Sequence, residues 1–320
     1  FHDHFKRSPA GHQPVMNDLA TTLCFPALGG EVLIQAEGPG SDLAVEEARE
    51  LVLDLHRRLT RFEPSSELCQ LNRSSDRAVK ASPLLLRFAE EVHRAGSNSG
   101  GLVDATLLDQ VEAAGYRDSI NPDDPAGPGP SSPGLEPPAR RWSWSDVTVD
   151  REKSTVIRPP GLRLDSGGIG KGLAADIVAE RLEGFDSWAV ECAGDLRFGG
   201  EGGAERRIDV KSPFPGRGVI ADFTASAGAV ATSGTTRRSW KTGSGDSHHL
   251  IDPRTGRPAR TGLVQVTAVA PTAVEAEVRA KAALLSGPDR ASEWLIDGGM
   301  FVTEEGEIRA WDFQRRPEVG

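Results

Sequence analysis

The segment LDSGGIGKGLAAD, residues 164–176, places four glycines and a lysine directly before a run that is typical of a helix. Glycines that lead into a helix can turn several backbone N–H groups toward an anion. Lys171 adds a positive charge, and Asp165 can accept a hydrogen bond from a ribose or an amide. The other interpretation is a tight strand-to-helix turn that carries a surface lysine.

The same segment fails the two common nucleotide motifs. A P-loop needs glycine where Asp165 stands and serine or threonine where Gly172 stands, and G-x-G-x-x-G does not match either. The segment therefore predicts an anion-binding turn of another type.

Two later segments carry groups suited to phosphate chemistry. HHLIDPRTGRPA, residues 248–259, has two adjacent histidines before a turn, and a histidine can act as a general base near neutral pH. The alternative is that both imidazoles face solvent beside a turn.

The second of these segments is ATSGTTRR, residues 231–238, which combines hydroxyl groups with two arginines that could contact phosphate. The nearby Lys-Thr-Gly at 241–243 is typical of penicillin-binding proteins, but no serine has a lysine three residues later, so that interpretation fails.

Periodicity predicts a mixture of strands and helices. Strands are expected at 31–36, 147–149, 155–157, 188–191, 207–211, 218–223 and 263–270. Helices are expected from Ser41, from Ser82 to just before Gly96, from the glycine turn at 166–172, and from Thr272 to about Ser286. Strands and helices do not alternate regularly, which favours an α+β fold.

The composition excludes several classes of protein. The 320 residues carry 37 basic and 47 acidic side chains, a net charge of −10, so the chain lacks the basic surface of a nucleic-acid-binding protein. Its three cysteines form no C-x-x-C pair, so neither a zinc site nor a disulfide framework is predicted. No apolar stretch of about 18 residues occurs, so no transmembrane segment is expected.

The organisation of the chain is predicted as follows. Residues 1–17 read as a tag or disordered arm, and 18–320 as a single domain of two intimate lobes with a Pro/Gly-rich loop at 121–138. As the sequence stands, a cytoplasmic protein is expected, with an exported mature form as the alternative.

Seven segments, in order along the chain, resemble the ApbE family of FAD:protein FMN transferases. They are RFEPSSELCQLN (61–72), GGLVDATLL (100–108), LDSGGIGKGLAAD (164–176), ECAGDLRFGG (191–200), ATSGTTRR (231–238), HHLIDPRTGRPA (248–259) and APTAVEAEVRAKAALLSG (270–287). The resemblance runs from about residue 26 to 303. It implies an ApbE-like α+β fold, related to the tunnelling fold, that holds FAD between two lobes.

The resemblance also implies an activity. Members of the family cleave FAD at its pyrophosphate with the help of Mg²⁺, attach FMN to a serine or threonine of an acceptor flavoprotein, and release AMP. The alternatives are an FAD-binding protein without transferase activity and an FAD pyrophosphatase that gives FMN and AMP.

The resemblance also implies which residues contact the cofactor. Positions that match the family's cofactor contacts are Leu28, Phe62, Leu102, Val103, Asp104, Asp165, Gly168, Lys171 and Ile251. Phe62 stands where the family usually has tyrosine, and the single tyrosine, Tyr116, is expected elsewhere. Gly168 matches a position that offers an oxygen to the metal, and His249 is a candidate base.

The late helix departs from the family at the metal site. Glu277 stands where the resemblance implies an aspartate ligand, and Lys281 where it implies a threonine ligand. Lys281 shares a helical stripe with Val274, Val278 and Leu285, and Glu277 lies one turn before it. We expect the Lys281 ammonium to stand in the position of Mg²⁺, paired with Glu277, as a cofactor-contacting and catalytic group. The alternative is a lysine that reaches outward to the surface.

Overall fold

The computed structural model describes residues 20–118, 135–242, 245–312 and 314–315. Within them, helices and antiparallel sheets are mixed, so the predicted α+β class is confirmed. The arm expected at 1–17 and most of the loop expected at 121–138 lie outside the described residues.

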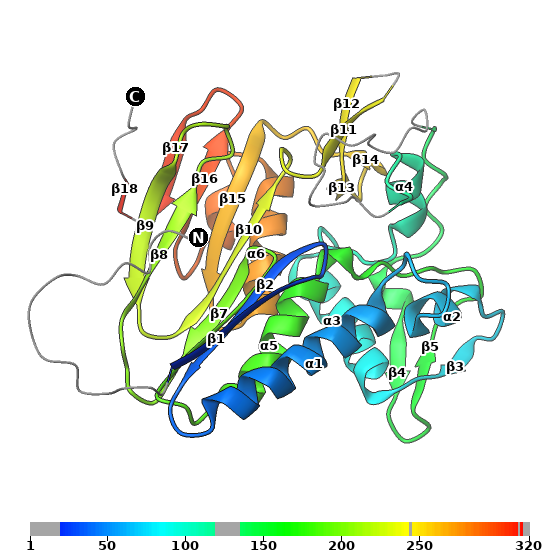
Figure 1. Ribbon diagram of the computed structural model, residues 1–320. Helices are drawn as coiled ribbons and strands as arrows, with labels where there is room; N and C mark the ends of the chain where they lie inside the picture. The colour runs from blue at the N-terminus through cyan, green and yellow to red at the C-terminus, as the bar shows by residue number, and fades with distance from the viewer. Residues whose placement is uncertain (1–19, 119–134, 243–244, 313, 316–320) are drawn as a thin grey trace, which may run out of the picture.

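An eight-stranded antiparallel sheet forms the centre of the molecule (Figure 1). Its spatial order is β1-β2-β6-β7-β10-β15-β16-β17. The strands are β1 Ala20–Ala27, β2 Gly30–Glu37, β6 Ser187–Cys192, β7 Asp195–Gly199, β10 Gly228–Gly234, β15 Leu263–Ala270, β16 Gly299–Thr303 and β17 Ile308–Trp311. Neighbouring strands such as β1 and β2 or β6 and β7 are joined by two-residue turns.

Three helices cover one face of this sheet: α1 Ser41–Leu59, α5 Gly170–Leu182 and α6 Ala273–Ser286. The other face carries a second sheet of β8 Arg206–Lys211, β9 Val219–Ala225 and β18 Gln314–Arg315. In β6, Val190 packs with the helices and its neighbour Ala189 packs with Ile208 of β8. This alternation is the two-residue period of a strand that is buried on both faces.

The remaining elements lie beside the sheet (Figure 1). They are α2 Glu67–Arg73, α3 Pro83–Asn98, α4 Leu108–Ala113, the sheet of β3 Ala78–Lys80, β4 Thr148–Asp150 and β5 Thr155–Ile157, the pair β11 Ser239–Thr242 and β12 Gly245–His248, the pair β13 Ile251–Asp252 and β14 Arg257–Pro258, and the short 3₁₀ turns η1 Trp144–Asp146, η2 Ser166–Gly168 and η3 Ala291–Trp294.

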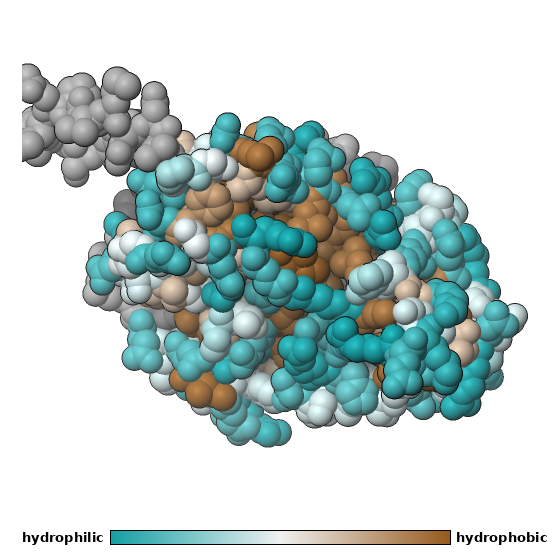
Figure 2. All heavy atoms as spheres, turned by 90° about the horizontal axis from the view of Figure 1, so that it is seen from below, coloured by the Kyte–Doolittle hydropathy of each residue, from teal (hydrophilic) through white to brown (hydrophobic). Residues whose placement is uncertain are grey.

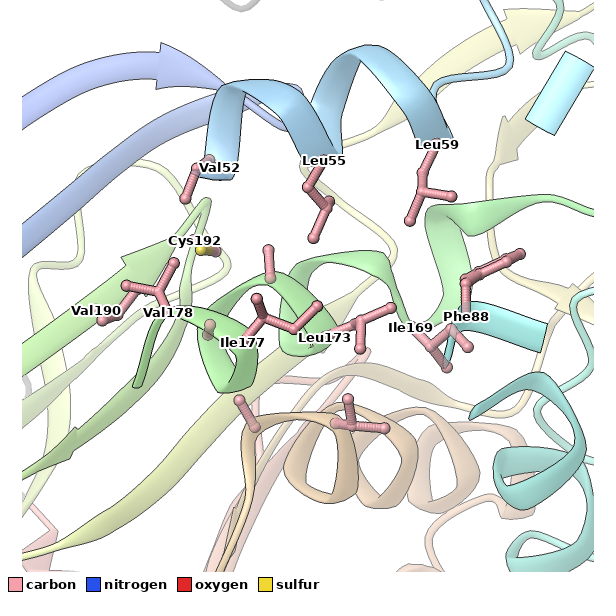
Figure 3. Close-up of a cluster of buried hydrophobic side chains, with 14 of the residues drawn as sticks. Val52, Leu55, Leu59, Phe88, Ile169, Leu173, Ile177, Val178, Val190 and Cys192 are labelled. Carbon is pink, nitrogen blue, oxygen red and sulfur yellow. The ribbon is translucent and has the colours of Figure 1, made fainter. Parts of the chain in front are cut away.

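Helix α5 lies in the middle of the largest hydrophobic cluster. Leu173, Ile177 and Val178 of α5 pack between Val52, Leu55 and Leu59 of α1 and the strand β6 (Figure 3). Nine residues of α5 are buried, on all sides of the helix. Each fully buried leucine or isoleucine contributes roughly 1.5–3 kcal/mol through the hydrophobic effect. The position of α5, and hence of the glycine turn before it, is therefore fixed by the core.

Gly172 sets the distance between α5 and α6. A Cβ at this position would lie 2.6 Å from the carbonyl oxygen of Ala273, at the start of α6. Asp176, one turn later in α5, accepts hydrogen bonds from the backbone N–H groups of Ala273 and Val274, at 2.8 and 2.9 Å. The N-terminus of α6 is thus held directly against α5.

One predicted helix end is wrong. Gly96 was expected to follow the helix that begins after Ser82, but α3 continues to Asn98. A Cβ on Gly96 would lie 2.0 Å from Cγ of Trp144, so this glycine makes room for a tryptophan ring. Gly96 is therefore needed for close packing against Trp144. The residues that commonly begin and end helices, from which the helix end was predicted, do not reveal such a contact.

The face seen in Figure 2 is mainly hydrophilic. Figure 2 shows one face, on which teal residues surround a brown hydrophobic area. The large hydrophobic side chains that are exposed are Leu43, Phe62, Leu135 and Ile296. No helix within the described ranges is long and apolar enough to cross a membrane.

We expect Gly172→Ala to destabilise the protein by about 1–3 kcal/mol, because the added methyl group would press against the backbone of α6. Gly168→Ala is the matched control, since a Cβ there meets no atom within 4 Å. Thermal unfolding of both variants measures the difference. Equal stability of the two variants would show that α5 and α6 do not approach this closely.

Candidate active site

The glycine turn and the first turn of α5 form the centre of the candidate site. Asp165 ends the preceding segment, and its backbone N–H donates to the carbonyl oxygen of Ala105 at 2.9 Å. Its carboxylate lies 3.4 Å from Nε of Arg61. Gly168 belongs to η2, and Lys171 follows in the first turn of α5. The glycine turn therefore leads into a helix as predicted, with the lysine in the first turn of α5, but no strand directly precedes it, since β5 ends at Ile157.

Lys171 is paired with a buried carboxylate. Its Nζ lies 2.7 Å from Oδ2 of Asp195, whose side chain is 1% exposed. Asp195 is the first residue of β7, directly after the two-residue turn of Ala193 and Gly194. Both turn residues have positive φ, 50° and 98°, as a tight hairpin turn between twisted strands requires. The hairpin thus fixes the position of Asp195 beneath the N-terminus of α5.

Helix α6 brings Glu277 and Lys281 to the same place. Lys281 Nζ lies 2.7 Å from Oε1 of Glu277, and Oε2 of Glu277 accepts a hydrogen bond of 2.9 Å from the backbone N–H of Gly172. Lys281 is 8% exposed and Glu277 is 1% exposed. The lysine therefore lies in the protein interior and does not reach outward to the surface.

These four side chains form a buried charge cluster of Lys171, Asp195, Glu277 and Lys281. Burial raises the pKa of Asp195, while the positive charges of Lys171 and Lys281 oppose this shift. The cluster contains two cations and two anions, so its charges balance without any other ion. Such balance is what allows several charges to stay buried together.

A divalent metal ion does not fit this cluster. One oxygen of Glu277 is engaged by Lys281 and the other by Gly172, and the carboxylate of Asp195 is paired with Lys171. The described residues hold no group of three or more histidine, cysteine, aspartate or glutamate side chains that could bind a metal. Mg²⁺ needs oxygen ligands, and here an ammonium group lies 2.7 Å from one oxygen of each carboxylate.

His249 lies near the charge cluster and is partly buried. Loss of water around the ring lowers its pKa well below the usual value, and the charges of Arg238 and Lys281 lower it further. Its Nδ1 lies 3.4 Å from the carbonyl oxygen of Arg238. A proton on Nδ1 would leave Nε2 as a free acceptor, so a neutral His249 can accept a proton at pH 7.

The tip of the β1–β2 hairpin contacts the side chain of Arg238, whose carbonyl oxygen lies beside this histidine. Leu28 and Gly29 form the turn, both with positive φ, and the carbonyl oxygen of Gly29 accepts a hydrogen bond of 3.3 Å from Arg238. The neighbouring His248 is held by the carbonyl oxygen of Ala259, 2.8 Å from Nε2. Neither histidine is therefore a solvent-facing turn residue.

An aromatic group borders the site on the side of Asp165. The Arg61 guanidinium lies 4.2 Å from the ring centre of Phe62 and 4.6 Å from that of Tyr116. The Phe62 and Tyr116 rings are 5.8 Å apart, and Trp240 follows at 5.6 Å from Tyr116. The expectation that Tyr116 lies elsewhere is wrong, because the chain after α4 returns to the loop between α1 and α2.

The other predicted cofactor contacts lie in more enclosed places. The side chain of Asp104 is fully buried, pairs with Arg140 and accepts two hydrogen bonds from Thr106, at 2.7 and 2.9 Å. Val103 is buried and Leu102 partly buried beside it. Ile251, in β13, packs in a small cluster with Trp240. That these four residues contact a cofactor stays a prediction.

Two contributors to the site were missed in the sequence. Asp195 lies in the segment ECAGDLRFGG, where Gly194 permits the positive φ of a tight turn but Ala-Gly does not by itself indicate a hairpin. Arg61 directly precedes Phe62, and nothing in the sequence around it indicates a role in the site. In both cases the partner, Lys171 or Tyr116, is distant in the sequence.

Comparisons with known proteins agree with this architecture. A model of the ApbE family matches residues 28–301. The FAD:protein FMN transferases of Haemophilus influenzae and Escherichia coli K12 are 26% identical to the chain over 267 and 268 residues, which is 79% of this chain and 75% of each relative. The ApbE protein of Thermotoga maritima superimposes with a TM-score of 0.79 at 24% identity, over 93% of this chain and 100% of that one. The flavin transferase ApbE of Vibrio cholerae gives 0.70 at 22% identity, over 91% and 96%. The predicted ApbE-like fold is confirmed.

We expect His249 to stay neutral as the pH falls from 8 to 6, because its folded-state pKa is well below that of a free imidazole. Two-dimensional NMR of the ring protons, assigned with His249→Asn, follows the titration, and the same resonance in urea should titrate near pH 6.5. The folded state binds fewer protons here than the unfolded state, so this group lowers stability as the pH falls through about 6.5. A midpoint near 6.5 in the native protein would contradict the assignment.

Proposed function

The chain belongs to the ApbE family, and we propose that it transfers FMN from FAD to a serine or threonine of an acceptor protein and releases AMP. Its relatives named above are FAD:protein FMN transferases, and the chain is accordingly a flavin transferase that acts on FAD. The observation that carries the finer proposal is the meeting of two lysine ammonium groups, Lys171 and Lys281, at the glycine-rich N-terminus of α5.

To catalyse this transfer, the protein has to position the acceptor hydroxyl against the phosphorus and to stabilise the negative charge of the pyrophosphate. The hydroxyl oxygen of the acceptor attacks the phosphorus of the FMN half of FAD, the bond from that phosphorus to the bridging oxygen breaks, and AMP leaves with that oxygen. The hydroxyl proton passes to a base. A neutral His249 with a free ring nitrogen suits that role, because a base that is already protonated at pH 7 could not accept the proton.

The charge that develops on the pyrophosphate needs a nearby cation. Lys171 is 17% exposed in its side chain, at the edge of the charge cluster, and Lys281 lies deeper in it. We assign both ammonium groups to the pyrophosphate, with Lys281 in the position that a metal ion would otherwise hold. An ammonium is a point charge with three donors, so it can contact several phosphate oxygens.

The flavin half of FAD is assigned to the aromatic side of the site. Phe62 is exposed and lies against Arg61, whose Nε is 3.4 Å from Asp165. An exposed ring at the edge of a site offers a surface on which a flat flavin ring can stack. Asp165 can accept a hydrogen bond from the same ligand.

We expect incubation with FAD and an acceptor domain to give AMP and acceptor-bound flavin in equal amounts, because each transfer breaks one pyrophosphate. Chromatography of AMP and in-gel flavin fluorescence measure the two products, and an acceptor with its Ser/Thr changed to alanine is the control. AMP without labelled acceptor would instead identify an FAD pyrophosphatase. Bound, uncleaved FAD would identify a binding protein without transferase activity.

We also expect the transfer rate to be unchanged by EDTA and by added Mg²⁺, because the carboxylates of the cluster are already paired with lysines. Lys281→Met should lower the rate by roughly 10²-fold or more, in the range of other removed electrostatic stabilisers. Lys153→Met, a lysine exposed on the surface, should leave it unchanged. A rate that depends steeply on Mg²⁺ would overturn the assignment of Lys281.

A further inference from the structure

Asp195 is the buried carboxylate whose presence the fold alone does not explain. It is 0% exposed, and within the described part of the chain its carboxylate has no close polar partner other than Lys171. Its Oδ2 lies 2.7 Å from Lys171 Nζ, the distance of a charge-assisted contact. A buried carboxylate with a single close partner is costly, and such groups are often kept for function.

We propose that Asp195 is a positioning residue: its carboxylate holds the Lys171 ammonium at the N-terminus of α5, ready to meet the pyrophosphate of FAD. This inference rests on the proposed function, since it names the group that orients one of the two proposed pyrophosphate contacts. Asp195 is too deeply buried to touch the ligand, so it acts through Lys171.

The geometry around Asp195 supports this role. The tight turn of Ala193 and Gly194 fixes the start of β7, and the packing of α5 fixes the backbone of Lys171. Only the long lysine side chain between these two fixed points remains to be oriented. A lysine side chain has many rotamers, and an ion pair that selects one of them before the ligand binds reduces the entropy lost on binding.

The contact also leaves the ammonium able to bind a second anion. An ammonium has three N–H donors, and the contact with Oδ2 of Asp195 uses one of them. The lysine side chain is 17% exposed, whereas its partner is 1% exposed. The ammonium therefore lies at the boundary between the buried carboxylate and the open side of the turn, where an anionic ligand would approach.

The other charged and titratable groups that face Asp195 do not replace this contact. Lys281 and Glu277 of α6 act on it electrostatically, and Cys192, in β6, is a fully buried thiol whose pKa is raised by burial. Lys281 already has its own carboxylate, Glu277, at 2.7 Å. The cluster thus divides into two pairs, and each lysine has one carboxylate of its own.

A double-mutant cycle tests the proposal. Asp195→Asn and Lys171→Met should each weaken FAD binding roughly 10- to 100-fold, as expected when a charged contact to an anion is lost. The double variant should bind FAD no more weakly than Lys171→Met, because Asp195 acts through that lysine. Equilibrium binding is followed by quenching of flavin fluorescence.

Riboflavin separates positioning from a merely structural role. It carries the flavin ring without the pyrophosphate, so Asp195→Asn should bind riboflavin as tightly as the unmodified protein does. A structural role would weaken both ligands together. Asp150→Asn, which breaks the surface ion pair with Lys153, is the control and should change neither affinity.

Additive losses in the cycle, unchanged FAD affinity in Asp195→Asn, or equal losses for riboflavin and FAD would each overturn the proposal. If Asp195→Asn fails to fold, the pair Lys171→Met with Asp195→Leu replaces both charges by apolar groups, and it should match Lys171→Met in FAD affinity. If the unmodified protein binds FAD but releases no AMP, the proposed function fails, while the cycle still decides the role of Asp195.

Discussion

The contact between the N-terminus of α5 and the side of α6 is the constraint on which the candidate site depends. Gly172 allows the two helices to approach until no Cβ would fit, and its N–H then donates to the carboxylate of Glu277. A helix N-terminus attracts negative charge, and here a side chain of the protein satisfies part of that attraction. Because Glu277 also holds Lys281, one close approach fixes a carboxylate, a cation and the start of a helix together.

The cluster shows how several buried charges can be tolerated beside the glycine turn. Each lysine has one carboxylate at 2.7 Å, and the two pairs come from three different parts of the chain: α5, the β6–β7 hairpin and α6. Separately, each of these charges would be costly to bury. Together they cancel, and the cations remain close to the glycine turn. Loss of water around the ring lowers the pKa of His249, and the charges of Arg238 and Lys281 lower it further, which keeps the ring neutral.

Local patterns in the sequence predicted what depends on local structure. The spacing of Val274, Val278, Lys281 and Leu285 placed Lys281 on the buried side of its helix, and the structure confirms that it is buried. The helix after the glycine turn and the strand at 263–270 were also predicted correctly.

What the sequence did not reveal depends on residues far apart in the chain. Gly96 ends no helix because Trp144 packs on it, and Tyr116 meets Phe62 because α4 lies beside the loop after α1. No feature of the sequence sets Asp195 apart, because its partner Lys171 lies 24 positions earlier in the chain. In each case the deciding partner lies in another element, so no window along the sequence contains both residues.

Cations that are covalently part of the chain change how the site assembles. In a metal centre, carboxylates that are brought together repel one another until the ion arrives, and folding is then linked to the supply of that ion. Here the charges of Asp195 and Glu277 are neutralised by lysines that the same chain delivers as α5 and α6 pack. The charge balance of this region therefore comes from the chain itself as it folds.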